Sequence, residues 1–211
     1  MTGHLQEREI TLDDSKKLKR EKIIQIAAKE FAEKGYDAAN INEIAVLSGI
    51  GKGSIYLYFK TKKELFLVTM QTVVDKFNEA SQSVMNLDCS LMDKLKLCLE
   101  SLFKFDDEYA PFIILWSRYQ FQNYPDFQDE VSEIFKGLRQ PFCEILKEGA
   151  EKGIFKTPHP EVSGYLVLSM ACMLIPSLQP KNLVFDLPAE EKAQFLIDFV
   201  LNGLASGEKR E

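Results

Sequence analysis

The segment that most constrains this chain of 211 residues runs from residue 40 to residue 65, where two short helical patterns flank a glycine. Asn40 is a good N-cap, and Glu43 can reach back as its capping-box partner, so a helix is expected to start directly after Asn40. The helix should stop near Ser48, because Gly49 can adopt the left-handed conformation that ends a helix. Its apolar stripe consists of Ile41, Ile44, Ala45 and Leu47.

A second helix is predicted from about Lys52 to Phe59, with Ile55 and Phe59 packing inward from one face. The other side carries small, polar or flanking residues: Lys52, Gly53, Tyr56, Leu57 and Lys60. A helix in the major groove of DNA needs small or polar side chains near base edges and hydroxyl or ammonium groups near phosphates. The pair therefore predicts a helix-turn-helix that reads DNA. The alternative on this pattern alone is a solvated helical hairpin.

Residues 20–66 resemble the N-terminal domain of TetR-type transcriptional regulators, through an apolar helix, Ala-Ala-x-x-Phe, Gly-Tyr, the glycine turn and Tyr-x-x-Phe. The matching residues are Ile24, Ala27, Ala28, Phe31, Gly35, Tyr36, Ile44, Ala45, Gly49, Ile50, Gly53, Ile55, Tyr56, Phe59, Lys62, Glu64 and Leu65. One departure is Asn40, where many members carry Thr, but Asn keeps the oxygen that caps the helix. The resemblance covers about a third of the chain and implies nothing about the identity of an effector.

The resemblance implies roles for individual positions in the DNA-binding segment. Phosphate contacts fall to Asn40, Tyr56, Tyr58, Lys60 and Lys62. Contacts to base edges are expected from Asn42, Lys52, Gly53 and Ser54. Lys52 is suited to guanine acceptors, and Gly53 permits close approach of the backbone to DNA. Leu57 is placed to contact a thymine methyl group.

Charge separates this segment from the rest of the chain. Residues 16–63 hold 11 Lys and Arg against 5 Asp and Glu, a net charge of +6, whereas residues 64–211 hold 14 against 23, a net charge of −9. Screening limits the reach of a charge to about 8 Å at physiological salt, so a basic head can bind DNA although the chain is acidic. We expect a flexible tail over 1–15, a DNA-binding domain over 16–63 and an effector-binding and dimerisation domain over 64–211.

The fold is predicted to be all-α, with about nine helices: three in the helix-turn-helix domain and six in the C-terminal domain. The six are expected over 62–85, 90 or 91–106, 111–122, 127–152 with a kink at Pro141, 161–178 and 188–204. The first of these six starts in the DNA-binding domain and ends in the effector-binding and dimerisation domain, so it is expected to transmit motion between the two domains.

Aromatic and methionine side chains suggest an apolar effector pocket in the body, although such stripes are more often plain core. The candidate lining residues are Phe103, Phe112, Trp116, Tyr119, Tyr124, Met170 and Met173. A hydrophobic or aromatic small molecule would suit such a pocket. Proteins of the resembled family are released from DNA when a ligand of this kind spreads their two heads.

The last two helices, over 161–178 and 188–204, are more apolar around their circumference than a monomer's surface helices should be. They either lie deep in the core or, as the resemblance implies, pair with their mates across a two-fold axis. A two-fold axis would space two heads about 34 Å apart, which matches palindromic half-sites one helical turn apart. We therefore expect a homodimer on double-stranded operator DNA.

Other classes of protein find little support. No apolar run is long enough for a membrane span and no leader opens the chain, so a soluble, cytoplasmic protein is expected. Four spaced cysteines, Cys89, Cys98, Cys143 and Cys172, suggest core residues rather than a metal or redox site. His4 and His159 lack catalytic neighbours, so neither an enzyme nor a cofactor is expected. The remaining alternatives are a helical small-molecule or lipid carrier and a ligand-independent architectural DNA-binding protein.

Overall fold

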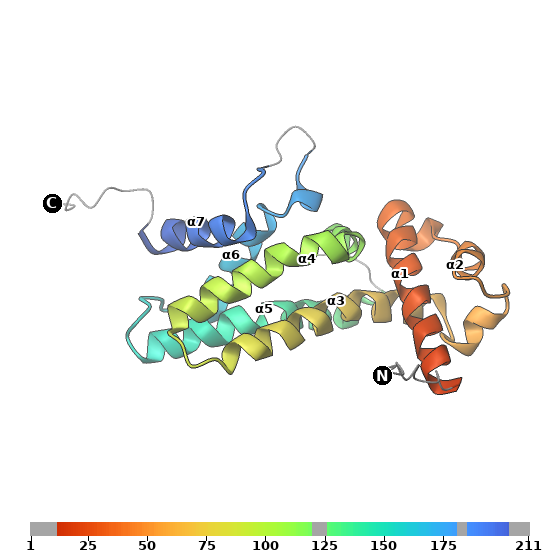
Figure 1. The fold of residues 1–211 in the computed structure, drawn as a ribbon, viewed down its shortest axis with the longest axis horizontal. Coiled ribbons are helices and arrows are strands. Elements are labelled where there is room, and N and C mark those ends of the chain that lie inside the picture. Colours follow the sequence, from red (N-terminus) through yellow and green to blue (C-terminus); the bar gives the residue numbers. More distant parts are fainter. Residues whose placement is uncertain (1–11, 120–125, 181–184, 203–211) are drawn as a thin grey trace, which may run out of the picture. The chain divides into compact units, whose positions relative to one another are not determined.

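The computed structural model describes residues 12–119, 126–180 and 185–202, and all regular secondary structure within them is helical. The chain forms two compact units, Met1–Thr69 and Met70–Glu211. Figure 1 shows the order of the elements along the chain. They are α1 (Leu12–Ala38), α2 (Ile41–Leu47), the 3₁₀ turn η1 (Ser54–Leu57), α3 (Lys62–Met85), α4 (Leu91–Tyr119), α5 (Gln128–Glu151), α6 (Pro160–Cys172), the 3₁₀ turn η2 (Pro176–Leu178) and α7 (Ala189–Asn202).

The first unit contains α1, α2, η1 and the first turns of α3. Its core includes Phe31 and Phe66, whose rings meet edge to face at 5.2 Å, and the ring of Tyr36 lies 5.1 Å from that of Phe66. The helix α1 begins at Leu12, so the expectation of a flexible tail reaching to residue 15 is wrong for 12–15. The earlier part of that tail lies outside the described residues.

In the second unit, α4 contains the two helices expected over 90 or 91–106 and 111–122, joined across a kink into one element. The backbone leaves helical geometry only at Tyr109, with φ −114° and ψ 16°, two residues before Pro111. Proline removes one helical hydrogen bond and crowds the preceding turn, so a kink is expected there. The chain resumes its helix after the kink, so Pro111 lies in the first turn of the second helical stretch, as expected.

Two further expectations for the body are corrected. Pro141 lies inside α5 without any departure from helical backbone angles, and it is buried in the core, where packing of its ring offsets the lost hydrogen bond. The helix expected over 161–178 ends at Cys172. Ile175 is extended, with ψ 119°, because the residue before Pro176 is sterically excluded from the helical region. The helices α3 and α7 match their expected ranges within the described residues.

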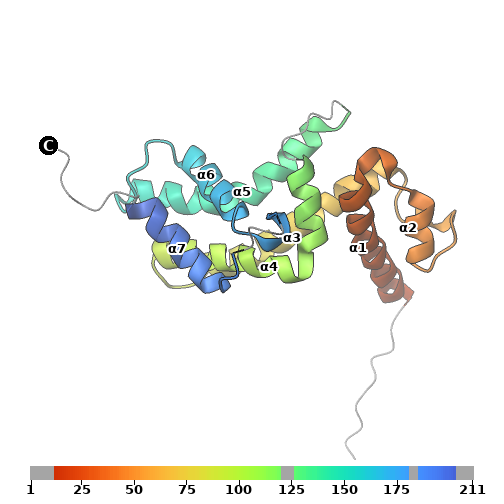
Figure 2. The same cartoon turned by 90° about the horizontal axis from the view of Figure 1, so that it is seen from above.

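The second unit packs its helices in pairs, α5 against α6 and α4 against α7, and both views show these pairs side by side (Figures 1 and 2). The ring of Phe77, from α3, stacks on Phe142 of α5 at 5.9 Å. At Gly137 of α5 an added Cβ would lie 3.0 Å from Val74, so the missing side chain lets α3 approach closely. Among the described residues, no helix is both long and apolar enough to cross a membrane.

Candidate nucleic-acid interface and interior cavity

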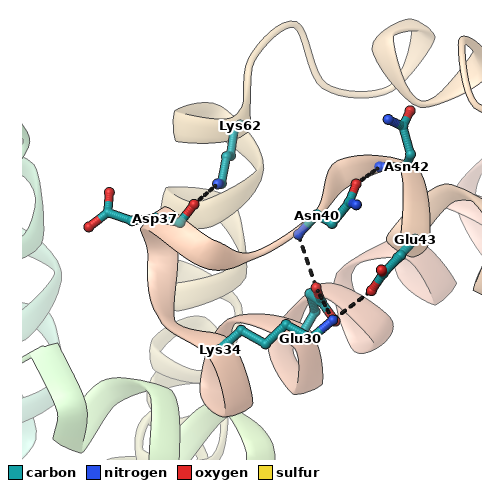
Figure 3. Close-up of polar contacts among 7 residues, drawn as sticks. All are labelled: Glu30, Lys34, Asp37, Asn40, Asn42, Glu43 and Lys62. Carbon is teal, nitrogen blue, oxygen red and sulfur yellow. Dashed lines mark hydrogen bonds and ion pairs between the residues drawn. The ribbon is translucent and has the colours of Figure 1, made fainter.

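The start of α2 is held by hydrogen bonds that reach across to α1 (Figure 3). Asn40 caps the helix as expected, because its Oδ1 accepts from the backbone N–H of Asn42 at 2.9 Å. The backbone N–H of Asn40 donates to Oε1 of Glu30 at 2.9 Å, and Glu30 is only 6% exposed. The expectation that Glu43 completes a capping box with Asn40 is therefore wrong. The carboxylate of Glu43 accepts from Lys34 instead, and Glu30 accepts the hydrogen bond from the backbone N–H of Asn40.

Lys34 joins the two carboxylates, with its Nζ 2.9 Å from Glu30 and 2.6 Å from Glu43. Hydrogen bonds to Glu43 and then to Glu30 raise the pKa of Lys34 to about 12. The ammonium is solvent-exposed, so screening keeps the contribution of these pairs to stability small. Their main consequence is geometric: they fasten the first turn of α2 to α1 (Figure 3).

The turn after α2 depends on Gly49, whose φ of +76° confirms the left-handed conformation expected there. The N–H of Gly49 donates to the carbonyl of Val46, and the N–H of Ile50 donates to the carbonyl of Ala45, both at 3.0 Å. These bonds satisfy the last carbonyls of α2. A side chain at Gly49 would be strained, so glycine fixes the direction in which the chain enters the next element.

The second helix of the motif is shorter than expected: a single 3₁₀ turn, Ser54–Leu57, replaces the predicted α-helix over 52–59. The two glycines of the GKG segment at its start each cost a helix about 1 kcal/mol relative to alanine, which opposes extension. The inward face is as predicted. Ile55 and Phe59 are 1% and 2% exposed, and the N–H of Phe59 donates to the carbonyl of Ile55 at 3.0 Å.

The outward face of this turn is open to solvent. Tyr56 is 54% exposed and Leu57 is 78% exposed, and Lys52 and Gly53 are exposed as well. Gly53 has ordinary helical angles, φ −79° and ψ −20°, and a Cβ built on it would meet no atom within 4 Å. Nothing in the described protein therefore requires glycine at this position. The close approach of an outside molecule gives a physical reason for the missing side chain.

The other expected contact residues surround this face. Asn40, Asn42 and Lys60 are exposed, whereas Ser54 and Tyr58 are half-buried. Together they present amide, hydroxyl and ammonium groups, the types that meet base edges and phosphates.

Lys62 is more engaged within the protein than its sequence position suggested. Its Nζ donates to the backbone carbonyl of Asp37 at 3.0 Å (Figure 3). The same Nζ lies 5.0 Å from the centre of the Tyr36 ring. The contact joins the start of α3 to the end of α1. An ammonium has three donors, so capacity remains for a phosphate. Sequence reasoning missed the contact because a main-chain carbonyl carries no residue-type signal.

The second unit contains a small apolar cavity of about 20 Å³. Its lining comes from α3, α4, α5 and the segment between the end of α6 and the start of η2: Val73, Phe77, Leu102, Phe105, Ile113, Trp116, Leu138, Cys172 and Ile175. A space of this size holds about one water molecule, so the core is nearly closed in this conformation. The indole N–H of Trp116, a side chain only 6% exposed, has no acceptor among the described residues.

The residues expected to line a pocket are dispersed. Trp116 lines the cavity. Three others are buried in α4 but do not line it: Phe103, Phe112 and Tyr119. Met170 lines a separate groove between α6 and α7, Met173 is 63% exposed, and Tyr124 lies outside the described residues. Sequence reasoning chose aromatic residues and missed the aliphatic lining, which no periodicity separates from ordinary core.

The helices α6 and α7 expose a set of large apolar side chains. The most exposed is Phe195 at 59%, and the set also includes Val162, Tyr165, Leu166, Val200 and Leu201. Residues of both helices, among them Leu166 and Leu201, line one open groove of about 540 Å³. Apolar surface gathered in this way marks an interaction site more often than a solvated face.

Comparison with known proteins agrees with this architecture. Residues 23–69 match the family model described as bacterial regulatory proteins, tetR family. The chain is 30% identical over 146 residues to the fatty acid metabolism regulator protein of Bacillus subtilis (strain 168), covering 66% of this chain and 74% of that protein.

Two solved structures share the fold. The transcriptional regulator FadR from Bacillus subtilis, in complex with stearoyl-CoA, gives a TM-score of 0.76 at 20% identity, covering 88% of this chain and 99% of that chain. AibR in complex with isovaleryl coenzyme A and operator DNA gives 0.69 at 18% identity, covering 87% and 98%. With its helix-turn-helix unit and its helical second unit, the chain belongs to the TetR family of bacterial transcriptional regulators, which are DNA-binding proteins rather than enzymes.

Proposed function

We propose that this regulator is a homodimeric repressor that binds a palindromic operator and is released from it by a fatty acyl-CoA. The observation that carries the proposal is the pairing of an open, polar reading surface in one unit with a nearly closed apolar cavity in the other. The relative that regulates fatty acid metabolism, and the two similar folds with acyl-CoA ligands, support the choice of ligand class.

The DNA-binding part assigns contacts to the exposed face around η1. Asn42, Lys52, Gly53 and Ser54 read base edges, with Leu57 against a thymine methyl group. The phosphate contacts come from Asn40, Tyr56, Tyr58, Lys60 and Lys62. The open space at Gly53 supports this division, because the backbone there can approach the bases without a side chain in the way.

The dimer uses the exposed apolar faces of α6 and α7. A two-fold pair covers the same patch on both subunits, which removes the exposed surface of Phe195 and Leu166 from water at once. It also presents the η1 turn of each subunit, which we call the reading turn, to one of two half-sites. These half-sites lie about one helical turn of DNA apart, roughly 34 Å.

The ligand part follows from the size of the cavity. An acyl chain does not fit in about 20 Å³, so it enters only a conformation in which the surrounding helices have moved apart. A ligand that binds the opened form alone shifts the population toward it, whereas equal affinity for both forms would shift nothing. The unpaired indole N–H of Trp116 supplies a donor for a carbonyl oxygen such as that of a thioester.

The proposal is tested on an operator recovered by selecting bound sequences from a random duplex pool. Fluorescence anisotropy of the labelled duplex is measured during titration with stearoyl-CoA, isovaleryl-CoA, stearate and coenzyme A alone. Acyl-CoA should weaken operator binding by about 5- to 150-fold, the usual range of allosteric coupling, and coenzyme A alone should not.

Two outcomes would count against it separately. If no acyl-CoA changes operator affinity at saturation, the ligand assignment is wrong and the DNA-binding assignment stands. If no duplex is bound even in dilute buffer, the repressor itself is rejected.

A further inference from the structure

The N-terminal half of α1 carries a basic surface that none of the roles above uses. Five cations fall within seven residues, and Glu21 is the single acid among them: Lys16, Lys17, Lys19, Arg20 and Lys22. Part of this set opens on a groove of about 430 Å³. The groove is lined by Asp13, Lys16, Lys17, Arg20, Leu57 and Tyr58. Three cations against the one carboxylate of Asp13 leave the lining with a net positive charge.

One wall of the groove is held in place by packing. The guanidinium of Arg20 lies 5.0 Å from the centre of the Phe59 ring, which is itself 2% exposed in the core of the unit. A cation stacked on a buried ring keeps its position and its charge. Less side-chain entropy is therefore lost when Arg20 binds an anion than when a freely rotating side chain does.

The two lysines of the groove are not neutralised within the protein. Neither Lys16 nor Lys17 has an ion pair among the residues that the structure describes. Five lysines elsewhere in the protein, one of them further along α1, are each paired with a glutamate: Lys34, Lys76, Lys104, Lys136 and Lys152. The α1 groove thus differs from an ordinary solvated helix face, where opposite charges alternate.

The place of the groove indicates its partner. Leu57 and Tyr58 belong to the end of the reading turn and also line the groove, so the two surfaces are continuous. The major groove of B-DNA is about 12 Å wide and is bordered by phosphates on both strands. When the turn enters the major groove, side chains directly beside it face that border.

We propose that the α1 groove binds the phosphate backbone of the operator duplex through Lys16, Lys17 and Arg20. The inference rests on the DNA-binding role proposed above and extends it to cations of α1, the helix that precedes the helix-turn-helix. The groove reads no base. It adds affinity for duplex DNA of any sequence and positions the reading turn relative to the backbone.

The test is the salt dependence of binding by the double variant Lys16→Ala, Lys17→Ala in the full chain. Each phosphate contact contributes about 0.9 to the slope of log affinity against log salt, so the slope should flatten by about two units per bound protomer. At 0.1 M salt the same relation gives a loss on the order of tenfold for each missing contact. The loss should be equal on the operator and on a scrambled duplex of the same length.

A matched control removes the same charge elsewhere: Lys29→Ala with Lys147→Ala, both exposed and outside the groove. Its slope should stay that of the parent protein. The variant Asp13→Asn works in the opposite direction and should tighten binding to both duplexes, which no folding defect would produce.

An unchanged slope in the Lys16, Lys17 variant, while the parent protein binds its operator, would overturn the groove assignment alone. A loss confined to the operator would overturn it too, because backbone contacts are blind to sequence. Absence of binding by the parent protein would instead reject the proposed function.

Discussion

The two units place their functional residues in opposite environments. In Met1–Thr69 the side chains that we assign to DNA are exposed or half-buried and mostly polar, and those that shape the unit, such as Phe31 and Ile55, are buried. In Met70–Glu211 the residues around the cavity are apolar and, apart from the half-buried Phe105, buried like the core that surrounds them. A function on a surface uses residue types that differ from those of a packed core, so the sequence can reveal it. A function in an interior uses buried apolar residues, which are the same residue types that stabilise the core.

The largest effect is expected from Leu166→Asp, which puts a carboxylate on the exposed apolar face of α6. A dimer across this face should dissociate, and affinity for the full operator should fall by about 10²-fold or more because avidity is lost. Light scattering gives the mass and anisotropy gives the affinity. Leu166→Met keeps the surface apolar and should remain dimeric. A parent protein of monomeric mass at micromolar concentration would contradict the proposed interface.

Gly53→Ala separates DNA approach from folding. The open space and helical angles at this position predict unchanged or slightly higher thermal stability, by about 0.4–1 kcal/mol. A methyl group against the bases should cost binding about 1–3 kcal/mol, or about 5- to 150-fold in affinity. Thermal unfolding measures the stability, and fluorescence anisotropy on the same samples measures the affinity for the operator. Undiminished affinity would show that DNA does not approach closely here.

Lys52→Ala and Lys62→Ala divide base reading from backbone binding. The first should relax preference at one base position by about 1–3 kcal/mol. The second should weaken binding to all sequences alike and flatten the salt slope by about one unit. It should also lower the stability of the unit by about 1 kcal/mol, because the hydrogen bond to Asp37 is lost. Equal loss of specificity in both variants, measured by selection from a random pool, would reject this division.

The smallest effect tests the interior. Val73→Ile adds one methylene group to the wall of a cavity of about 20 Å³ and should stabilise the closed form by about 0.8 kcal/mol. The acyl-CoA concentration for half-release from the operator should then rise about fourfold. Val84→Ile, on the same helix but outside the cavity, should leave it unchanged. The same rise in both variants would mean that the cavity is not where the ligand enters.

Local chemistry was readable from the sequence in the first unit and at several helix boundaries. The range of α3 followed from a stretch free of glycine and proline, and Gly49 marked the turn because its conformation excludes other residues. The two prolines inside helices were harder to interpret. Pro111 bends α4 whereas Pro141 leaves α5 regular, and the difference depends on what packs around each ring.

The contacts of individual side chains could not be predicted where the partner is distant in sequence. Glu30 lies ten positions before Asn40, and only the fold brings its carboxylate to that N–H in preference to the nearby Glu43. The cavity is an extreme case. Its walls come from four segments of the chain, and any of its aliphatic residues would suit an ordinary core equally well.

The sequence by itself determined the all-helical architecture, the helix caps and turns, and the inward and outward faces of the reading motif, since these follow from residue types a few positions apart. The tertiary structure decided which carboxylate holds the start of α2, where the apolar interior leaves space, and that α1 shares a basic groove with the reading turn. Those features arise from long-range packing, which the order of residues encodes only through the complete fold.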